Sequence, residues 1–199
     1  DFWDESQDLI EALRHEAVAL IGSFAGHIVH DKQIFEALYH PQTKALLTAE
    51  ENAFVERHVP RTVFLNDKDI DLEEVRHNKD AWIIKPTDNY GARDVYAGLS
   101  FTQKEWDELI TRFANEAAGA PFIAQTYITP FKTHTLAPDT NIENLADNEV
   151  DTQGTWYNNL NGLYLYNGEF QGIFSRLGPL PTISKEHKGM TAATLHVRG

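Results

Sequence analysis

The sequence predicts an α+β fold built as two small lobes. Through the first 60 residues, apolar side chains recur mostly at helical spacing. From residue 61 the pattern changes to short apolar segments typical of strands. Near the C-terminus, two further segments flank Asn167-Gly168, a dipeptide typical of tight hairpins. A chain of 199 residues is long enough for two such lobes that share an interface.

The first 60 residues are expected to form helices. A first amphipathic helix is predicted over residues 6–21, with Gly22 as its stop, and a second over residues 31–38. Residues 48–51, Thr-Ala-Glu-Glu, form a capping box that opens a third helix, which ends before Pro60. The apolar residues of the first helix are Leu9, Ile10, Leu13, Ala17 and Leu20.

The middle of the chain should form a sheet with helices across it. Strands are predicted over residues 61–65, 81–85 and 121–128, with a helical turn over 72–77. A capping box at residues 102–105, Thr-Gln-Lys-Glu, opens another helix. Its apolar stripe consists of Trp106, Leu109, Ile110 and Phe113, which we expect to pack on the sheet.

A second sheet should close the chain. Residues 141–154 are polar and acidic and are interpreted as a loop or linker. Residues 160–166 and 170–176 are the predicted hairpin strands. The expected organisation is a helical segment packed on the lobes, a first lobe and a C-terminal sheet lobe, which span residues 1–60, 61–140 and 141–199.

Composition restricts the partners. The formal net charge of −13 and the pI near 5.0 oppose binding to nucleic acid or to anionic membranes. The chain has no cysteine, no long apolar run and no basic leader, which favours a cytoplasmic location. It opens at Asp1 without an initiating Met, so we expect a fragment whose partner is the N-terminal remainder of a longer protein.

The segment most indicative of function is residues 81–98. Lys85 follows three bulky apolar residues, so its ammonium group should emerge at the end of a buried strand. Pro86 stops the ladder, and Gly91 allows unusual backbone angles in the loop that follows. One fixed cation beside free backbone donors is typical of a phosphate site. The alternative is a hairpin whose lysine merely ends a strand.

Two other chemistries are less favoured. His27 and His30 are three residues apart, but Gly26 argues against a firm helix there and no third ligand lies at metal-binding spacing. The chain also lacks a Gly-x-Ser-x-Gly elbow, which argues against a serine triad.

Five segments of the chain carry a family resemblance. They are IVHDKQIFEAL (28–38), VPRTVFL (59–65), WIIKPTDNYGARDVYAG (82–98), FIAQTYI (122–128) and GIFSRLG (172–178). Taken in order, they resemble the circularly permuted ATP-grasp proteins related to glutathionylspermidine synthase. The resemblance runs from about Gly22 to the C-terminus and implies an ATP-grasp-like fold with nucleotide between the two lobes.

The resemblance also implies roles for residues. Two lysines would contact the phosphates, a loop over residues 88–94 would form a flap, and a short hinge would present backbone groups to the adenine edge between Ile83 and Ile128. Arg176 would act as the catalytic residue, at the transferring phosphoryl group. The cofactor-binding residues implied are Lys32, Lys85, Asp88, Tyr90, Gly91, Gln125, Thr126 and Tyr127. Further candidates for substrate, metal or phosphate are Asp151, Asn158, Asn159, Asn161, Lys185 and Lys188.

Members of this superfamily use ATP and Mg²⁺ to activate a carboxylate as an acyl phosphate, which an amine attacks to give an amide, ADP and phosphate. Small-molecule acid and amine substrates are therefore the implied partners, and the metal ligands are expected outside this chain. One departure is the sequence Gly91-Ala92-Arg93-Asp94, where the family usually carries adjacent glycines. The alternatives are a degenerate ATP-grasp-like domain with an interaction or structural role, and a plain α+β domain in which Lys32, Lys85 and Arg176 do not converge.

Overall fold

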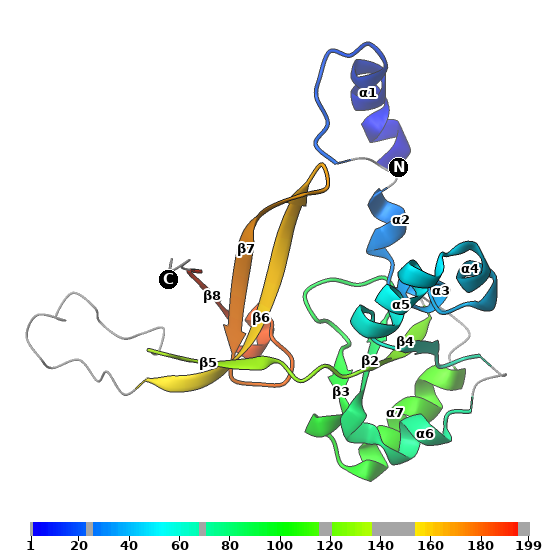
Figure 1. The fold of residues 1–199 in the computed structure, drawn as a ribbon, viewed down its shortest axis with the longest axis vertical. Helices are drawn as coiled ribbons and strands as arrows, with labels where there is room; N and C mark the ends of the chain where they lie inside the picture. Colours follow the sequence, from blue (N-terminus) through cyan, green and yellow to red (C-terminus); the bar gives the residue numbers. More distant parts are fainter. Residues whose placement is uncertain (1, 23–25, 68–70, 116–120, 137–153, 195–199) are drawn as a thin grey trace, which may run out of the picture.

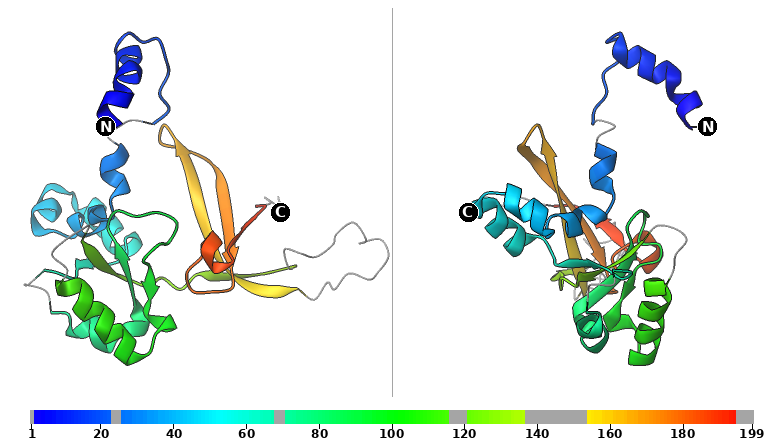
Figure 2. Two further views of the ribbon diagram at one scale, coloured as in Figure 1. Left: turned by 180° about the vertical axis from the view of Figure 1, so that it is seen from behind. Right: turned by 90° about the vertical axis from the view of Figure 1, so that its right-hand side faces the viewer.

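The chain folds as a mixed α+β structure with two antiparallel four-stranded sheets in separate lobes (Figure 1). The computed structural model describes residues 2–22, 26–67, 71–115, 121–136 and 154–194. The left view of Figure 2 shows the two lobes side by side from behind, with the N-terminal helix extending beyond both. The predicted α+β class is confirmed.

The first sheet carries the hydrophobic core. Its strands are β1 (Thr62–Phe64), β2 (Trp82–Pro86), β3 (Tyr96–Ala97) and β4 (Phe122–Thr126), in the order β1-β4-β2-β3. Helices α6 (Glu73–His77) and α7 (Gln103–Asn115) pack against it, with the short 3-10 turns η1 (Lys79–Ala81) and η2 (Gly98–Ser100). The buried cluster consists of Val63, Leu65, Val75, Trp82, Ile84, Trp106, Ile110, Phe113 and Ala124.

Alternation along β2 decides which residues face this core. Trp82, Ile84 and Pro86 are buried, whereas Ile83 and Lys85 between them are only partly buried on the opposite face. On the core side, the Trp106 indole Nε1 donates to the Val75 carbonyl oxygen at 2.8 Å, which satisfies its buried polar atom. Lys85 is therefore held on the side of the sheet that faces away from α6 and α7.

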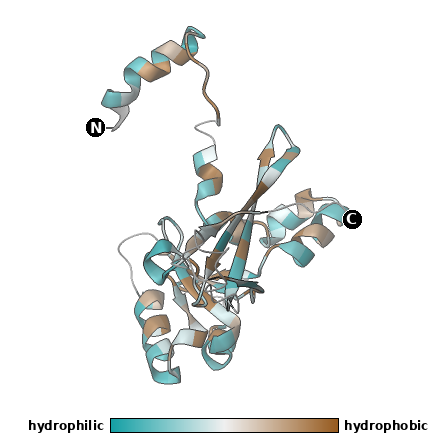
Figure 3. Cartoon of the chain, turned by 90° about the vertical axis from the view of Figure 1, so that its left-hand side faces the viewer, coloured by the Kyte–Doolittle hydropathy of each residue, from teal (hydrophilic) through white to brown (hydrophobic). Residues whose placement is uncertain are grey.

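The second sheet is built around a long hairpin. Its strands are β5 (Phe131–Thr135), β6 (Thr155–Tyr166), β7 (Glu169–Gly178) and β8 (Met190–Ala192), paired in that order, and η4 (Lys185–His187) lies between the last two. Asn167 and Gly168 have φ angles of 54° and 81°, so the predicted hairpin turn is confirmed. Figure 3 shows hydrophobic and hydrophilic residues distributed along the projecting hairpin.

Helices fill the N-terminal third. They are α1 (Phe2–Arg14), α2 (Gly26–His30), α3 (Gln33–Ala37), α4 (Pro41–Leu46) and α5 (Ala49–His58). The expected capping boxes are confirmed: Thr48 and Glu51 cap α5, and the same exchange between Thr102 and Glu105 opens α7. The α5 helix ends before Pro60 as predicted.

The first helix ends earlier than the apolar spacing predicted. It stops at Arg14, because Glu16 adopts a left-handed φ of 54° and the Ala17 N–H donates to the Ala12 carbonyl oxygen at 2.9 Å. Gly22 has a φ of 86° but lies well beyond that end. The predicted boundary at residue 21 is therefore wrong.

Three further elements differ from the sequence reading. Gly26 begins helix α2, so the argument that this glycine opposes a helix is wrong. Helix α4, with Pro41 at its first position, and strand β5 were not predicted.

The predicted loop at 141–154 lies outside the described residues except for Gly154. Of the helices in the described ranges, none is long and apolar enough to cross a membrane.

Candidate functional site

A cavity of about 230 Å³ lies between the two sheets. Its first wall comes from β2, from β4 and the segment that follows β4, while its second wall comes from β6 and the loop after β7. The lining is mostly apolar, with one cation, one amide and one phenol among it. The lining residues are Pro60, Ile83, Lys85, Gln125, Thr126, Tyr127, Ile128, Pro130, Leu160, Pro181, Thr182 and Ile183. This cavity brings together all three predicted hinge residues and one predicted phosphate lysine.

Lys85 is the cation of the cavity. Its Nζ donates to Gln125 Oε1 at 2.5 Å. Burial, followed by the nearby charge of Lys32, lowers the pKa of Lys85 from 10.5 to about 8. The ammonium group is thus held in a place that disfavours its charge, which is an arrangement found at functional lysines.

Lys32 comes from the turn that precedes α3. Its Nζ donates to the carbonyl oxygens of Thr87 and Asn89 at 3.1 and 3.0 Å, and its backbone N–H donates to the Thr87 carbonyl oxygen at 2.9 Å. These bonds tie the N-terminal helical segment to the loop that follows β2. Lys32 is close enough to Lys85 to lower its pKa, so the structure brings the two predicted phosphate lysines together.

The two lysines lack a counter-ion within the part of the chain that the structure describes. Their three side-chain hydrogen bonds go to neutral oxygens, on Thr87, Asn89 and Gln125. No carboxylate of the described residues forms an ion pair with either ammonium group. Two neighbouring positive charges without compensation can attract an anion.

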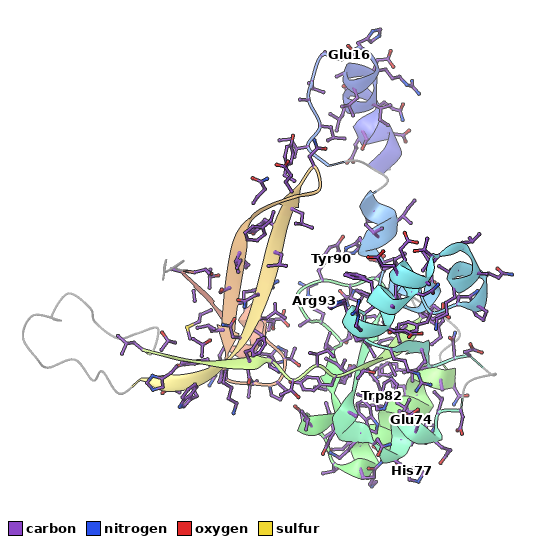
Figure 4. All side chains as sticks on the ribbon, viewed as in Figure 1. Glu16, Glu74, His77, Trp82, Tyr90 and Arg93 are labelled. Atoms are coloured by element: carbon purple, nitrogen blue, oxygen red, sulfur yellow. The ribbon has the colours of Figure 1, made fainter. Side chains whose placement is uncertain are left out.

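The predicted flap is the loop between β2 and β3, where Figure 4 labels Tyr90 and Arg93. Asp88 Oδ1 lies at hydrogen-bond distance, 3.1 Å, from His30 Nε2. The Tyr90 ring stacks on the His30 ring, with 4.5 Å between the centroids. Arg93 lies 3.9 Å from a Glu186 carboxylate oxygen of η4 in the other lobe. The loop is therefore anchored to α2 at one end and reaches the second lobe at the other.

Three residues of this loop have left-handed backbones. Gly91, Ala92 and Asp94 have φ angles of 66°, 62° and 54°. Glycine adopts this region freely, whereas alanine is strained there by about 1–2 kcal/mol. The backbone thus takes angles that favour glycine at Ala92 and Asp94, which carry side chains.

The backbone N–H groups of two predicted hinge residues are already engaged. The Thr126 N–H donates to the Arg61 carbonyl oxygen at 2.9 Å, and the Tyr127 N–H donates to the Ala81 carbonyl oxygen at 2.8 Å. Among the described residues, the N–H of Ile128 has no such partner. The donor available to a flat polar ligand therefore belongs to Ile128, which was predicted as a wall of the site and lies one residue after the hinge.

Tyr127 also connects the lobes. Its hydroxyl donates to the Pro181 carbonyl oxygen at 3.1 Å, and burial raises the pKa of the Tyr127 phenol. The contact joins the end of the first sheet to the loop after β7. It closes one side of the cavity, because both residues belong to the lining.

Arg176 stands apart from the lysines. It lies on β7 directly opposite Leu160 of β6, so its side chain shares the face of the sheet that carries that lining residue. Its guanidinium lies over the Phe174 ring at 5.6 Å from the centroid, and Arg176 itself does not line the cavity. The structure therefore places Arg176 one strand away from the cavity.

The remaining candidates do not gather around the lysines. Asn158 donates to the Leu180 carbonyl oxygen on the face of Leu160, whereas Asn159 and Asn161 occupy the opposite face and bond to Thr133 and Ser175. Asp151 lies outside the described residues. Lys185 and Lys188 are exposed at η4.

The histidine pair that is closest in sequence lies on one short helix. The His27 and His30 rings stack at 5.4 Å between centroids on α2, which is the shared helix face that their spacing allows. Within the described residues, no group of three or more His, Cys, Asp or Glu side chains is arranged to hold a metal ion.

Sequence reasoning missed residues of the second lobe that line the cavity and one buried residue behind it. Leu160, Pro181 and Ile183 come from the second lobe, where no local pattern points to a ligand. Thr62 is buried next to Gln125 and accepts a bond from its amide at 2.7 Å. Its signal was available as a polar residue inside an apolar strand.

The fold and the site together define a two-lobed α+β protein with a cation-bearing, largely apolar cavity between its sheets. Comparisons with protein-family models, with curated proteins and with solved structures gave no match to this chain.

Proposed function

We propose that this chain is the ATP-binding region of an ADP-forming carboxylate–amine ligase of the ATP-grasp type, similar to glutathionylspermidine synthase. One observation carries the proposal: Lys85 lines an apolar cavity between two antiparallel sheets, Lys32 lies close enough to lower its pKa, and neither lysine has a counter-ion among the described residues. Such a site complements a ligand with a flat apolar part and a polyanionic part.

ATP has both parts. The adenine ring would lie between Ile83, Ile128 and Leu160, and the Ile128 N–H would donate to its polar edge. The phosphates would extend toward Lys85 and Lys32 at the flap. A volume of about 230 Å³ is below the roughly 300–1,000 Å³ of whole-ligand pockets, so the cavity suits the base while the phosphates lie along the loop.

The proposed reaction has two steps. A carboxylate oxygen of the acid attacks the γ-phosphorus, the bond from that phosphorus to the β-γ bridging oxygen breaks, and ADP leaves. The amine nitrogen then attacks the acyl carbon, phosphate leaves with the former carboxylate oxygen, and the nitrogen loses a proton. Lys85 and Lys32 would hold the phosphates in both steps, and Arg176 would reach the transferring group when the lobes close. Mg²⁺, when bound, would supply positive charge that offsets the charge of the phosphates, and its protein ligands are expected outside this chain.

Calorimetric titration with ATP and a non-hydrolysable analogue, with and without Mg²⁺, tests the nucleotide site. We expect saturable binding that Lys85→Met abolishes. Lys104→Met is the matched control, because Lys104 is an exposed lysine of α7 that does not line the cavity. Equal binding by Lys85→Met and the native chain would contradict the assignment.

The ligase chemistry needs a separate test. The chain, ATP and Mg²⁺ would be incubated with amino acids, peptides or polyamine conjugates that carry a free carboxylate, with hydroxylamine present to trap an acyl phosphate as a hydroxamate. We expect hydroxamate and ADP in equal amounts with the correct acid. ADP release without hydroxamate for every acid would oppose an acyl phosphate.

A second candidate is a degenerate ATP-grasp-like domain with an interaction or structural role. The flap favours it, because Lys32 is engaged by backbone carbonyls of Thr87 and Asn89, and strained Ala92 and Asp94 replace glycine. A folded native chain that shows no heat with millimolar ATP, with or without Mg²⁺, would support this candidate over the ligase.

A further inference from the structure

A chain of hydrogen bonds starts at Lys85 and crosses three strands. Lys85 Nζ donates to Gln125 Oε1 at 2.5 Å, and Gln125 Nε2 donates to Thr62 Oγ1 at 2.7 Å. Thr62 Oγ1 donates to the Pro60 carbonyl oxygen at 3.0 Å. This series of three hydrogen bonds, here called the relay, ends on a backbone acceptor and contains no carboxylate.

Sheet register builds this relay. Gln125 of β4 lies directly opposite Thr62 of β1 on one side and opposite Ile83 of β2 on the other. Lys85 is two residues beyond Ile83 and therefore lies on the same face as Gln125, at the diagonal position that a long side chain can reach. Gln125 and Thr62 are 5% and 2% exposed, so neither is free to rearrange toward water.

The direction of the relay follows from the donors and acceptors available. An ammonium group has only donors, so Lys85 must face the amide oxygen of Gln125. The amide nitrogen then turns to Thr62, whose own hydrogen goes to Pro60. Both ends of the buried amide are therefore hydrogen-bonded within the protein, and its oxygen is held against Lys85.

We propose that Gln125 is a positioning residue, which fixes the Lys85 ammonium for phosphate contact while leaving its positive charge uncompensated. The inference rests on the proposed function, and it changes the role of Gln125 from a nucleotide contact to a determinant of the lysine. Glutamate has nearly the same shape and could accept the same bond, but its charge would neutralise Lys85. The neutral amide is thus what keeps this cavity selective for anions.

The proposal predicts that Gln125→Glu raises thermal stability and weakens ATP binding. The new ion pair should raise the melting temperature without nucleotide, because it compensates a buried cation and Thr62 can turn its hydroxyl hydrogen from Pro60 to the new carboxylate. The same pair should weaken ATP binding at least tenfold, because the phosphate no longer meets a free charge. A purely structural role predicts that stability and binding rise or fall together.

The experiment compares the native chain with Gln125→Glu, Lys85→Met and the double variant. Melting temperatures and calorimetric ATP affinities would be measured from pH 7 to pH 10. Within the described residues, the titratable side chains at this cavity are Lys85, Tyr127 and the adjoining Lys32. Native affinity should fall as Lys85 loses its proton. In the Lys85→Met background, Gln125→Glu should lower the melting temperature, because the buried carboxylate then has no partner.

The outcomes separate this inference from the proposed function. Native ATP binding that Gln125→Glu leaves intact would overturn the positioning role and leave the nucleotide site standing. Absence of native ATP binding would overturn the proposed function. The melting temperatures of the native chain, the two single variants and the double variant would then test the relay by themselves. If Gln125→Glu raises the melting temperature only when Lys85 is present, the result supports the relay. If Gln125→Glu changes the melting temperature equally with Lys85 and with Met at position 85, the result refutes the relay.

Discussion

Replacing Lys85 with methionine should abolish nucleotide binding and raise the free energy of unfolding at pH 7. The pKa of Lys85 falls from 10.5 to about 8, and this difference corresponds to about 3 kcal/mol by which the fold disfavours the ammonium group. Methionine removes that penalty but also removes the donor to Gln125, at a cost of about 2 kcal/mol. We therefore expect Lys85→Met to be about 1 kcal/mol more stable than the native chain at pH 7.

The dependence on pH is the sharper readout. Below pH 8 the lysine is protonated in the folded and unfolded states, so it adds no pH dependence there. Between pH 8 and 10.5 the unfolded state binds more protons, so native stability should rise with pH. By pH 10 the native chain should gain about 2–3 kcal/mol relative to Lys85→Met.

Urea unfolding at pH 7 and pH 10, followed by fluorescence of the buried Trp82 and Trp106, measures this difference. Comparing the two proteins at each pH cancels the other groups that titrate in this range. A difference in unfolding free energy that stays constant from pH 7 to pH 10 would refute the reasoning that Lys85 is held in an unfavourable environment.

Three further substitutions test the surroundings of the site. Tyr127→Phe removes the hydroxyl that donates to Pro181, so the free energy of unfolding should fall by about 1 kcal/mol in a urea titration; an unchanged value would show that the bond adds nothing. Ala92→Gly should raise unfolding free energy by up to about 1 kcal/mol and not weaken ATP binding, because it relieves a φ of 62°. Gly98→Ala should fail to give the native circular dichroism spectrum, because its Cβ would lie 1.8 Å from the Lys79 carbonyl oxygen; a native-like melting temperature would contradict this packing.

Local chemistry made much of the fold predictable. Both capping boxes involve side chains only three residues from their partners, and the Asn167-Gly168 turn specifies its own hairpin. The predicted end of α1 was wrong because no local pattern marks it: Glu16 adopts a φ angle that its residue type does not favour. Strand β5 was missed because Pro130 reads as a stop, although pairing with β6 restarts the strand directly after it.

The site was predictable in part. Lys85 and Gln125 stand out as polar residues at or in apolar strands, and the resemblance named Lys32 as well. The relay through Thr62 depends on the strand order β1-β4-β2, which joins residues 63 positions apart along the chain. Such an order follows from the packing of whole elements and not from any local pattern.

The two sheets share no strand, and the buried apolar cluster belongs to the first. We therefore expect the lobes to open as separate units, and the second has far fewer buried side chains to stabilise it. In hydrogen exchange, amides of β6 and β7 should open more readily than those of β2 and β4. A molecule seated against both Ile83 and Leu160 couples the units, so it would slow exchange in the second sheet without touching most of its strands.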